Sequence, residues 1–247
     1  MGRVWVHAAL AVVSRFVIEL CVGPRTLELA KYLVGSVAMC CTGAPLPLLL
    51  IDDHRPYPAA ILDVFGVVGH RRRRHRRGRK KHPTLKAPPG LLVGIVHKLR
   101  DATGNLLGVK TRALFGRLKD IRQRIAALGI GQQINTSHLE RLNGTMRGQQ
   151  TRLARRTRNG SRGQRWLGWA LWLWRDLYNW VHPHRSLEGR TPAMALGLSD
   201  RVWLVLDYIR HPVHVSELKR EEWSDQRKTV QESALDRYFR KKPLPTS

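Results

Sequence analysis

Short apolar runs alternate with segments of helical spacing from residue 4 to residue 115, and this alternation is the strongest constraint on the fold. The runs at residues 4–13 and 15–22 are separated only by Ser14, so they predict a hairpin or two sequential strands that are largely buried. Residues 26–39 follow Gly23 and Pro24 and carry apolar side chains at helical spacing, which predicts a helix. Strands and helices that alternate in this way favour the α/β class.

The next apolar run, at residues 45–51, predicts a buried strand that delivers Asp52 and Asp53 at its end. A helix is expected at residues 57–65, with Pro58 in its first turn and Gly66 at its end. The remaining predicted elements are strands at residues 91–98 and 106–115 around a turn at 101–105, a helix at 117–128, a helix capped by Thr136 or Ser137 that runs through Arg147, and a long helix that reaches about His182.

The long helix is rich in tryptophan, and we predict that Trp166, Trp169 and Leu173 mark its buried stripe. Five tryptophans are candidates for stacking on unpaired bases, although helical spacing favours core packing for most of them: Trp166, Trp169, Trp172, Trp174 and Trp180. His182 and His184 bracket Pro183, which favours a loop at the helix end over a metal site. A shorter helix is expected after Thr191 and Pro192.

The expected organisation is a core at residues 1–150, a helical C-terminal region at 151–215 and a charged tail at 216–247. Within the core, residues 70–90 interrupt the apolar pattern with a nearly continuous arginine and lysine run followed by prolines. Such a segment cannot bury enough apolar surface to fold by itself, so it is predicted to be a disordered, basic insertion.

The chain carries 44 Lys and Arg residues against 18 Asp and Glu residues, which gives a formal net charge of +26. A positive field of this size attracts polyanions and releases their condensed counterions, so DNA is the leading partner and an anionic membrane surface is the competitor. Residues 32–51 are uncharged and long enough to span a bilayer, but Pro45 and Pro47 interrupt them, so no membrane insertion is expected. Three cysteines lie in apolar segments and predict reduced core residues of a cytosolic protein: Cys21, Cys40 and Cys41. With DNA as the expected partner, the expected location is cytoplasmic and nucleoid-associated.

Two carboxylates stand out because acids are scarce in this chain. Asp52 ends a predicted strand, and Glu140 lies on a predicted helix much later in the sequence. Taken singly, a strand-end aspartate is more often a turn or cap residue, and a helical glutamate is more often a solvated surface group. The arginine run at residues 71–81 is likewise either a solvated loop or an arm that contacts DNA phosphates and adds affinity without sequence readout.

The local sequence around these acids favours the functional interpretation. Residues 134–147, INTSHLERLNGTMR, closely resemble the signature of bacterial insertion-sequence transposases of the DDE, RNase H-like class. Five further stretches resemble the same family in the same order: residues 3–26, 49–58, 89–98, 109–116 and 190–203. The resemblance covers roughly residues 3–205, and the ordered set is far more specific than any one stretch.

The resemblance implies a core in which acids from two strands and one helix hold two divalent metal ions about 4 Å apart for phosphoryl transfer at the ends of a DNA element. Magnesium is the expected metal, because it prefers carboxylate oxygens and keeps positions open for phosphate and water. By motif matching, Asp52 is similar to the second acid of the family and Glu140 to the third, whereas Asp53 is secondary. Residues expected to contact DNA are Arg71, Arg72, Arg73, Arg74, Arg76, Arg77, Arg79, Lys80, Lys81, Arg141, Asn143, Arg147, Arg155 and Arg156.

The first acid of the family lies on a strand that precedes the segment resembled by residues 3–13, and this chain is expected to lack the N-terminal part and that first catalytic strand. Residues 3–13 contain no Asp or Glu, and Glu19 matches no motif. The expected fold is therefore an incomplete RNase H-like core, a mixed sheet with flanking helices, and the isolated chain is expected to lack catalysis. A complementing full-length transposase or a second copy is the expected protein partner. The alternatives are a non-catalytic, basic nucleic-acid-binding protein on a degenerate transposase scaffold and a membrane-associated protein anchored by residues 4–51.

Overall fold

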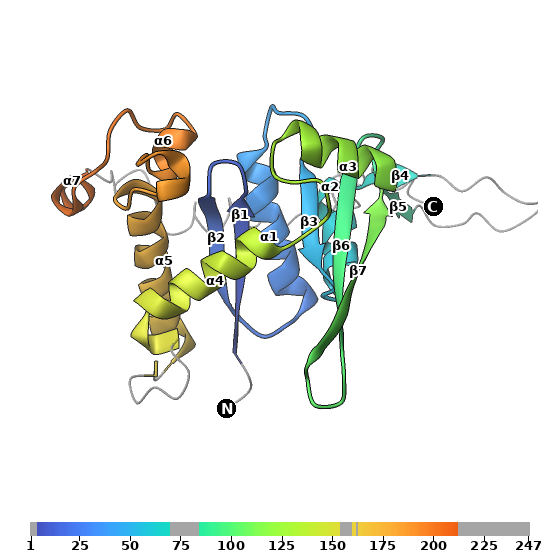
Figure 1. Ribbon diagram of the computed structural model, residues 1–247, viewed down its shortest axis with the longest axis horizontal. Helices are drawn as coiled ribbons and strands as arrows, with labels where there is room; N and C mark the ends of the chain where they lie inside the picture. The colour runs from blue at the N-terminus through green and yellow to red at the C-terminus, as the bar shows by residue number, and fades with distance from the viewer. Residues whose placement is uncertain (1–3, 70–83, 154–159, 162, 212–247) are drawn as a thin grey trace, which may run out of the picture. The chain divides into compact units, whose positions relative to one another are not determined.

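The computed structural model of the chain describes residues 4–69, 84–153, 160–161 and 163–211 (Figure 1). These residues form two compact units. The first unit contains the N-terminal segment up to Arg25 and the segment that starts at Arg122, and the second unit contains Thr26–Ile121. The predicted boundary at residue 150 lies inside the first unit. The basic run at residues 71–81 and the charged tail lie outside the described residues.

The first unit is built on a hairpin. β1 (Trp5–Ala11) pairs antiparallel with β2 (Phe16–Gly23), which confirms the hairpin predicted from the two apolar runs. Helix α4 (Ser137–Gln149) packs on β1 and helix α5 (Gln164–Trp180) packs on β2, and Figure 1 shows α5 beside the hairpin. These four elements share one apolar core, whose buried members are Val17, Leu20, Leu142, Met146, Leu171, Trp174 and Tyr178.

The amide side chain of Asn179 joins α5 to the edge of β2. Asn179 is 1% exposed, and its Oδ1 accepts a hydrogen bond from the Val17 N–H at 2.9 Å. Its Nδ2 donates to the Val17 carbonyl oxygen, also at 2.9 Å. The side chain therefore satisfies both backbone groups of Val17, which would otherwise be buried without partners.

The buried face of α5 differs from the predicted one. The expectation that Trp166, Trp169 and Leu173 line the buried stripe is wrong, because these side chains are 57%, 42% and 51% exposed. The buried face carries Leu171, Trp174 and Tyr178 instead. Apolar residues occupy almost every side of this helix, so spacing alone does not select a face. The contacts with β2, including those of Asn179, select it.

Short helices follow α4 and α5 in the described part of the first unit. Thr191 caps the predicted short helix by accepting a hydrogen bond from the Met194 N–H at 3.2 Å, and Pro192 occupies its first turn, as expected. The helices are η1 (Thr151–Leu153), η2 (Arg185–Leu187), α6 (Pro192–Ala195) and α7 (Val205–Arg210).

The second unit contains a small mixed sheet. β3 (Leu48–Asp52) pairs in parallel with β6 (Leu92–Arg100), and β6 pairs antiparallel with β7 (Leu106–Phe115). Helices α1 (Leu27–Cys40) and α2 (Tyr57–Phe65) pack together, and both contribute to a core with this sheet: Ala30, Val34, Ala60, Ile61, Leu91 and Val93. The turn after β6 is held by Asp101, which accepts from the Asn105 N–H at 2.7 Å, as its sequence predicts.

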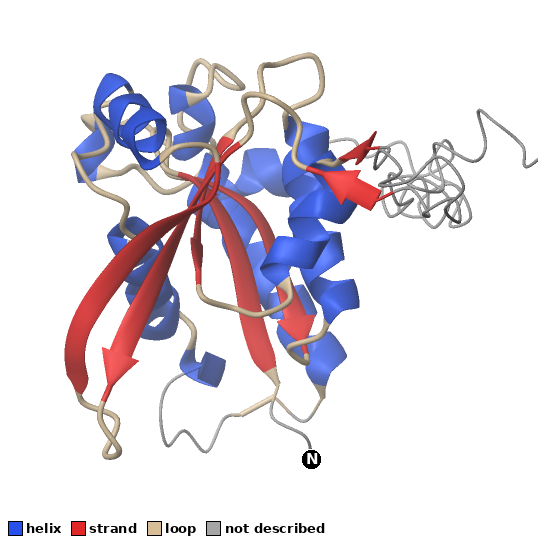
Figure 2. Cartoon of the chain, turned by 90° about the vertical axis from the view of Figure 1, so that its right-hand side faces the viewer, coloured by secondary structure: helices blue, strands red, loops and turns tan. Residues whose placement is uncertain are grey.

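Two short strands in the second unit were not predicted, β4 (Val67–Gly69) and β5 (Thr84–Lys86), which pair antiparallel. Helix α3 (Leu118–Ala127) forms where a helix was expected and contains the boundary between the units. Helices and strands both make up large parts of the chain (Figure 2). The α/β class is therefore confirmed, as small sheets with flanking helices.

The cysteine prediction holds in part. Cys21 is buried in β2, where burial and then the nearby Glu19 carboxylate raise the pKa of its thiol to about 12. Cys40 is exposed at the end of α1, so the expectation of a core position is wrong for this residue. Within the described ranges, no helix is both long and apolar enough to cross a bilayer.

Candidate functional site

Asp52 lies where the sequence places it, at the last position of β3. β3 pairs with β6 through its backbone while Leu49 and Ile51 pack against the core of the second unit, and Asp52 stands opposite Val96 in the parallel register. Its carboxylate is exposed and makes no hydrogen bond or ion pair with any residue that the structure describes. Two carboxylate oxygens at a strand end are thus open to solvent, and such hard oxygen donors suit Mg²⁺.

Asp53, the next residue, has partners of its own. Its Oδ2 lies 2.5 Å from Nδ1 of His97, and its Oδ1 lies 3.5 Å from Nη2 of Arg112. Both neighbours come from the adjoining strands β6 and β7. Exposed pairs of this kind contribute about 0–1 kcal/mol each. They give Asp53 a structural role that Asp52 lacks, in line with its secondary place in the motif.

Glu140 lies in the first turn of α4, where a negative charge interacts favourably with the helix dipole. Its Oε1 accepts a hydrogen bond from the Thr136 hydroxyl at 2.9 Å. Thr136 is the N-cap residue, but its side chain is directed to Glu140 and caps no backbone N–H. The carboxylate is therefore exposed and oriented by a neighbouring hydroxyl, and it too suits a hard cation.

The other signature residues follow on the same helix. Leu142 and Met146 face the core, whereas Arg141 and Arg147 are exposed and Asn143 is half-buried. The expected helical spacing is confirmed, and the two guanidinium groups are accessible to a phosphate backbone. Contact of these side chains with DNA stays a prediction, as it does for residues 71–81, Arg155 and Arg156, which lie outside the described residues.

The two acids belong to different units, Asp52 to the second and Glu140 to the first. Their approach to one another therefore stays a prediction. Over the described parts of the chain, no group of three or more His, Cys, Asp or Glu side chains is placed to hold a metal ion.

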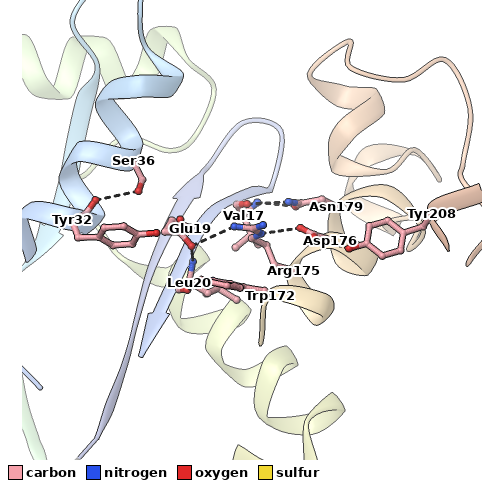
Figure 3. Close-up of polar contacts among 10 residues, drawn as sticks. All are labelled: Val17, Glu19, Leu20, Tyr32, Ser36, Trp172, Arg175, Asp176, Asn179 and Tyr208. Carbon is pink, nitrogen blue, oxygen red and sulfur yellow. Dashed lines mark hydrogen bonds and ion pairs between the residues drawn. The ribbon is translucent and has the colours of Figure 1, made fainter. Parts of the chain in front are cut away.

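Glu19, the unmatched acid of β2, takes part in a polar network of the first unit (Figure 3). Its Oε1 lies 3.3 Å from Nη1 of Arg175, whose Nε lies 2.9 Å from Oδ1 of Asp176. The Tyr208 hydroxyl donates to Oδ2 of Asp176 at 2.9 Å, and burial together with this bond raises the pKa of Tyr208 to about 12. Glu19 is only 8% exposed, and its pairing with Arg175 gives it a structural part in the contact between β2 and α5.

The exposed tryptophans make a second accessible surface on α5. The Arg165 guanidinium lies 4.4 Å from the ring centroid of Trp169, and the Trp166 and Trp169 rings contact edge to face at 4.9 Å. Because both rings are partly exposed, base stacking stays a prediction for them. Trp174 is buried in the core, which confirms the packing interpretation for that residue.

Sequence reasoning missed a pocket of the first unit that is lined by arginine and histidine side chains, including Arg15, His138 and Arg141. Arg15 Nη1 contacts Nδ1 of His138. Burial, and then the charges of Arg15 and Arg141, lower the pKa of His138. His182 and His184 lie in the loop after α5, as predicted, and both line this pocket.

Comparison of the chain with protein-family models, with curated proteins and with solved structures finds no match.

Proposed function

We propose that this chain is a transposase of the DDE class, or a descendant of one, that acts on the ends of a DNA element. The observation that carries the proposal is the form of the signature segment. Residues 134–147 resemble the family signature, and they place Glu140, Arg141 and Arg147 on the exposed face of α4 while Leu142 and Met146 anchor that helix in a core. The acid and the two cations of the signature are thus accessible to a metal ion and to a phosphate backbone, as the resemblance implies.

Asp52 supports the same proposal from the second unit. It ends a strand, it is exposed, and its carboxylate is free of described partners, whereas the adjacent Asp53 is engaged by His97 and Arg112. A strand-end carboxylate that is left open is what a metal ligand requires. The mixed β3–β6–β7 sheet with α1 and α2 against it also agrees with the mixed, helix-flanked sheet that the resemblance implies.

In the proposed mechanism, Asp52 and Glu140 would each give carboxylate oxygens to Mg²⁺. When bound, such ions generate the attacking oxygen nucleophile and stabilise the leaving 3′ oxygen of the phosphodiester. Thr136 orients Glu140 through its 2.9 Å hydrogen bond. Arg141 and Arg147 would contact phosphates of the bound DNA and fix the register of the DNA strand without reading its sequence.

A metal titration tests the proposal. Mn²⁺ binding in the presence of duplex DNA, followed by electron paramagnetic resonance, should weaken in both Asp52→Asn and Glu140→Gln. Because even outer-shell partners of a metal site cost about 10–100-fold in affinity, loss of a direct ligand should cost at least about tenfold. Asp53→Asn is the matched control, since it removes the neighbouring carboxylate, and it should bind Mn²⁺ as the unaltered chain does.

A non-catalytic nucleic-acid-binding protein is the second candidate, favoured by the net charge of +26. In that case Asp52→Asn and Glu140→Gln bind Mn²⁺ and DNA as well as the unaltered chain. This result would contradict the transposase proposal and leave the DNA-binding one.

A further inference from the structure

A pocket of about 300 Å³ opens in the first unit, at a distance in sequence from Asp52. One of its lining residues, Arg141, is also a proposed phosphate contact of the signature helix, whereas the pocket as a whole has no role in the proposed function. Four segments line it: the β1–β2 turn, helix α4, the last turn of α5, and the loop that leads from α5 into η2. Its volume is at the lower end of the range of about 300–1,000 Å³ that is typical of small-ligand sites. It would hold a group of the size of a single nucleotide.

The lining of this pocket is cationic. It includes three guanidinium groups, from Arg15, Arg141 and Arg185, and three imidazoles, from His138, His182 and His184. The hydroxyls of Thr145 and Ser186 add neutral donors. None of the described residues that line it is an Asp or Glu, so among these residues its charges have no carboxylate counterpart. We name it the cationic pocket.

Arg15 occupies an unfavourable backbone conformation beside this pocket. Its φ is 60°, in the left-handed region, at the last position of the tight turn between β1 and β2. A left-handed residue is usually glycine or asparagine, and a bulkier one costs of order 1–3 kcal/mol unless the surroundings compensate for it. The conformation places the Arg15 guanidinium in a pocket that Arg141 also lines. Burial lowers the pKa of Arg15, and the charge of Arg141 lowers it further.

A polar atom without a partner lies in the same lining. The Nε2 of His184 is buried and has no hydrogen-bond partner in the part of the chain that the structure describes. The His184 ring packs edge to face against Tyr178, with the centroids 4.4 Å apart, so its position is fixed. Buried ring nitrogens are normally satisfied, and one left open at the wall of a pocket is suited to a ligand oxygen.

We propose that the cationic pocket binds a phosphate group, with the attached sugar against the apolar part of the wall that Leu142 and Tyr178 provide. Guanidinium groups suit this ligand because their planar N–H pairs match two phosphate oxygens at once. A divalent cation is disfavoured by the same charges. The phosphate can belong to a free nucleotide or to a nucleotide of a DNA strand, and the chemistry of recognition is the same in both.

The test uses the full chain with EDTA in every titration, so that binding through a metal ion is excluded and the result is independent of Asp52 and Glu140. The probes are inorganic phosphate, deoxyadenosine 5′-monophosphate, a short single-stranded oligonucleotide with a 5′ phosphate, and glutamate as a carboxylate anion. Arg141→Gln and Arg185→Gln each remove one exposed cation from the pocket. Arg124→Gln is the matched control, because Arg124 is equally exposed and does not line the pocket.

We expect each pocket variant to lose about tenfold or more in affinity for the phosphate probes, which is the effect of removing one charge-assisted hydrogen bond. Arg124→Gln should bind them unchanged. Selective loss with phosphate or the mononucleotide supports a free-ligand source, and selective loss with the oligonucleotide alone supports a strand source. The proposal is overturned if the unaltered chain binds no phosphate probe, if it binds glutamate as tightly, or if Arg124→Gln loses as much as the pocket variants.

Discussion

Replacement of Asn179 by alanine tests how the first unit is held together. The amide is 1% exposed, and both of its hydrogen bonds to Val17 measure 2.9 Å. Alanine leaves a buried N–H and a buried C=O without partners, and each such group costs about 1–3 kcal/mol. The expected loss in the free energy of unfolding of this unit is therefore about 2–6 kcal/mol, which is a large part of the stability of a typical domain.

Urea denaturation followed by tryptophan fluorescence measures this loss, because the tryptophans of α5 belong to the same unit. Leu173→Ala is the control on the same helix. Leu173 is 51% exposed, so its truncation should change the unfolding free energy by no more than about 0.5 kcal/mol. A loss below about 1 kcal/mol for Asn179→Ala, or an equal loss in the two variants, would refute the packing of α5 on β2 described above.

Three other predictions follow from the charges and acids of the chain. Neutralising the cations of residues 71–81 should flatten the dependence of duplex-DNA affinity on salt, since each lost phosphate contact removes about 0.9 from the log–log slope; equal binding at every salt concentration would contradict the arm interpretation. The chain alone should neither cleave nor join labelled element-end DNA with Mg²⁺ or Mn²⁺, because only Asp52 and Glu140 match the three acids of the family; cleavage that an Asp52→Ala, Glu140→Ala variant lacks would show that a third ligand was overlooked. Burial lowers the pKa values of His138 and His184, so the stability that these groups contribute is present above the unfolded histidine pKa of about 6.5 and is lost as pH falls through the lower folded values. The melting temperature should therefore be lower at pH 5.0 than at pH 7.5, and sulfate should reduce this difference. Equal melting temperatures at the two pH values would contradict the prediction.

The sequence was most informative for elements that have a single apolar side able to pack into a core. The apolar run before Asp52 predicts a strand, and β3 forms there with Asp52 at its last position. The signature helix was equally predictable, because Leu139, Leu142 and Met146 are three and four residues apart on a mostly polar segment and so define its buried side.

Helix α5 shows why the rest could not be predicted. Its apolar residues leave several faces able to enter a core, and the choice of Leu171 over Leu173 depends on β2, a strand far away in the sequence. The cationic pocket was missed for a related reason. Arg15, Arg141 and Arg185 come from three distant segments, and no local pattern marks them as neighbours. The only signal in the sequence was the overall excess of cations, which does not locate a site.

The proposed function requires Asp52 and Glu140 to bind the same metal ions, and cleavage of the polypeptide by bound iron tests this requirement most directly. Fe²⁺ takes the place of Mg²⁺ at oxygen-ligand sites, and with ascorbate and peroxide it produces radicals that cut the backbone next to the metal. The chain bound to duplex DNA should be cut near residue 52 and near residue 140, and Asp52→Asn should lose both cuts together. Cuts near only one of these residues, or cuts near residue 140 that persist in Asp52→Asn, would contradict a shared metal site.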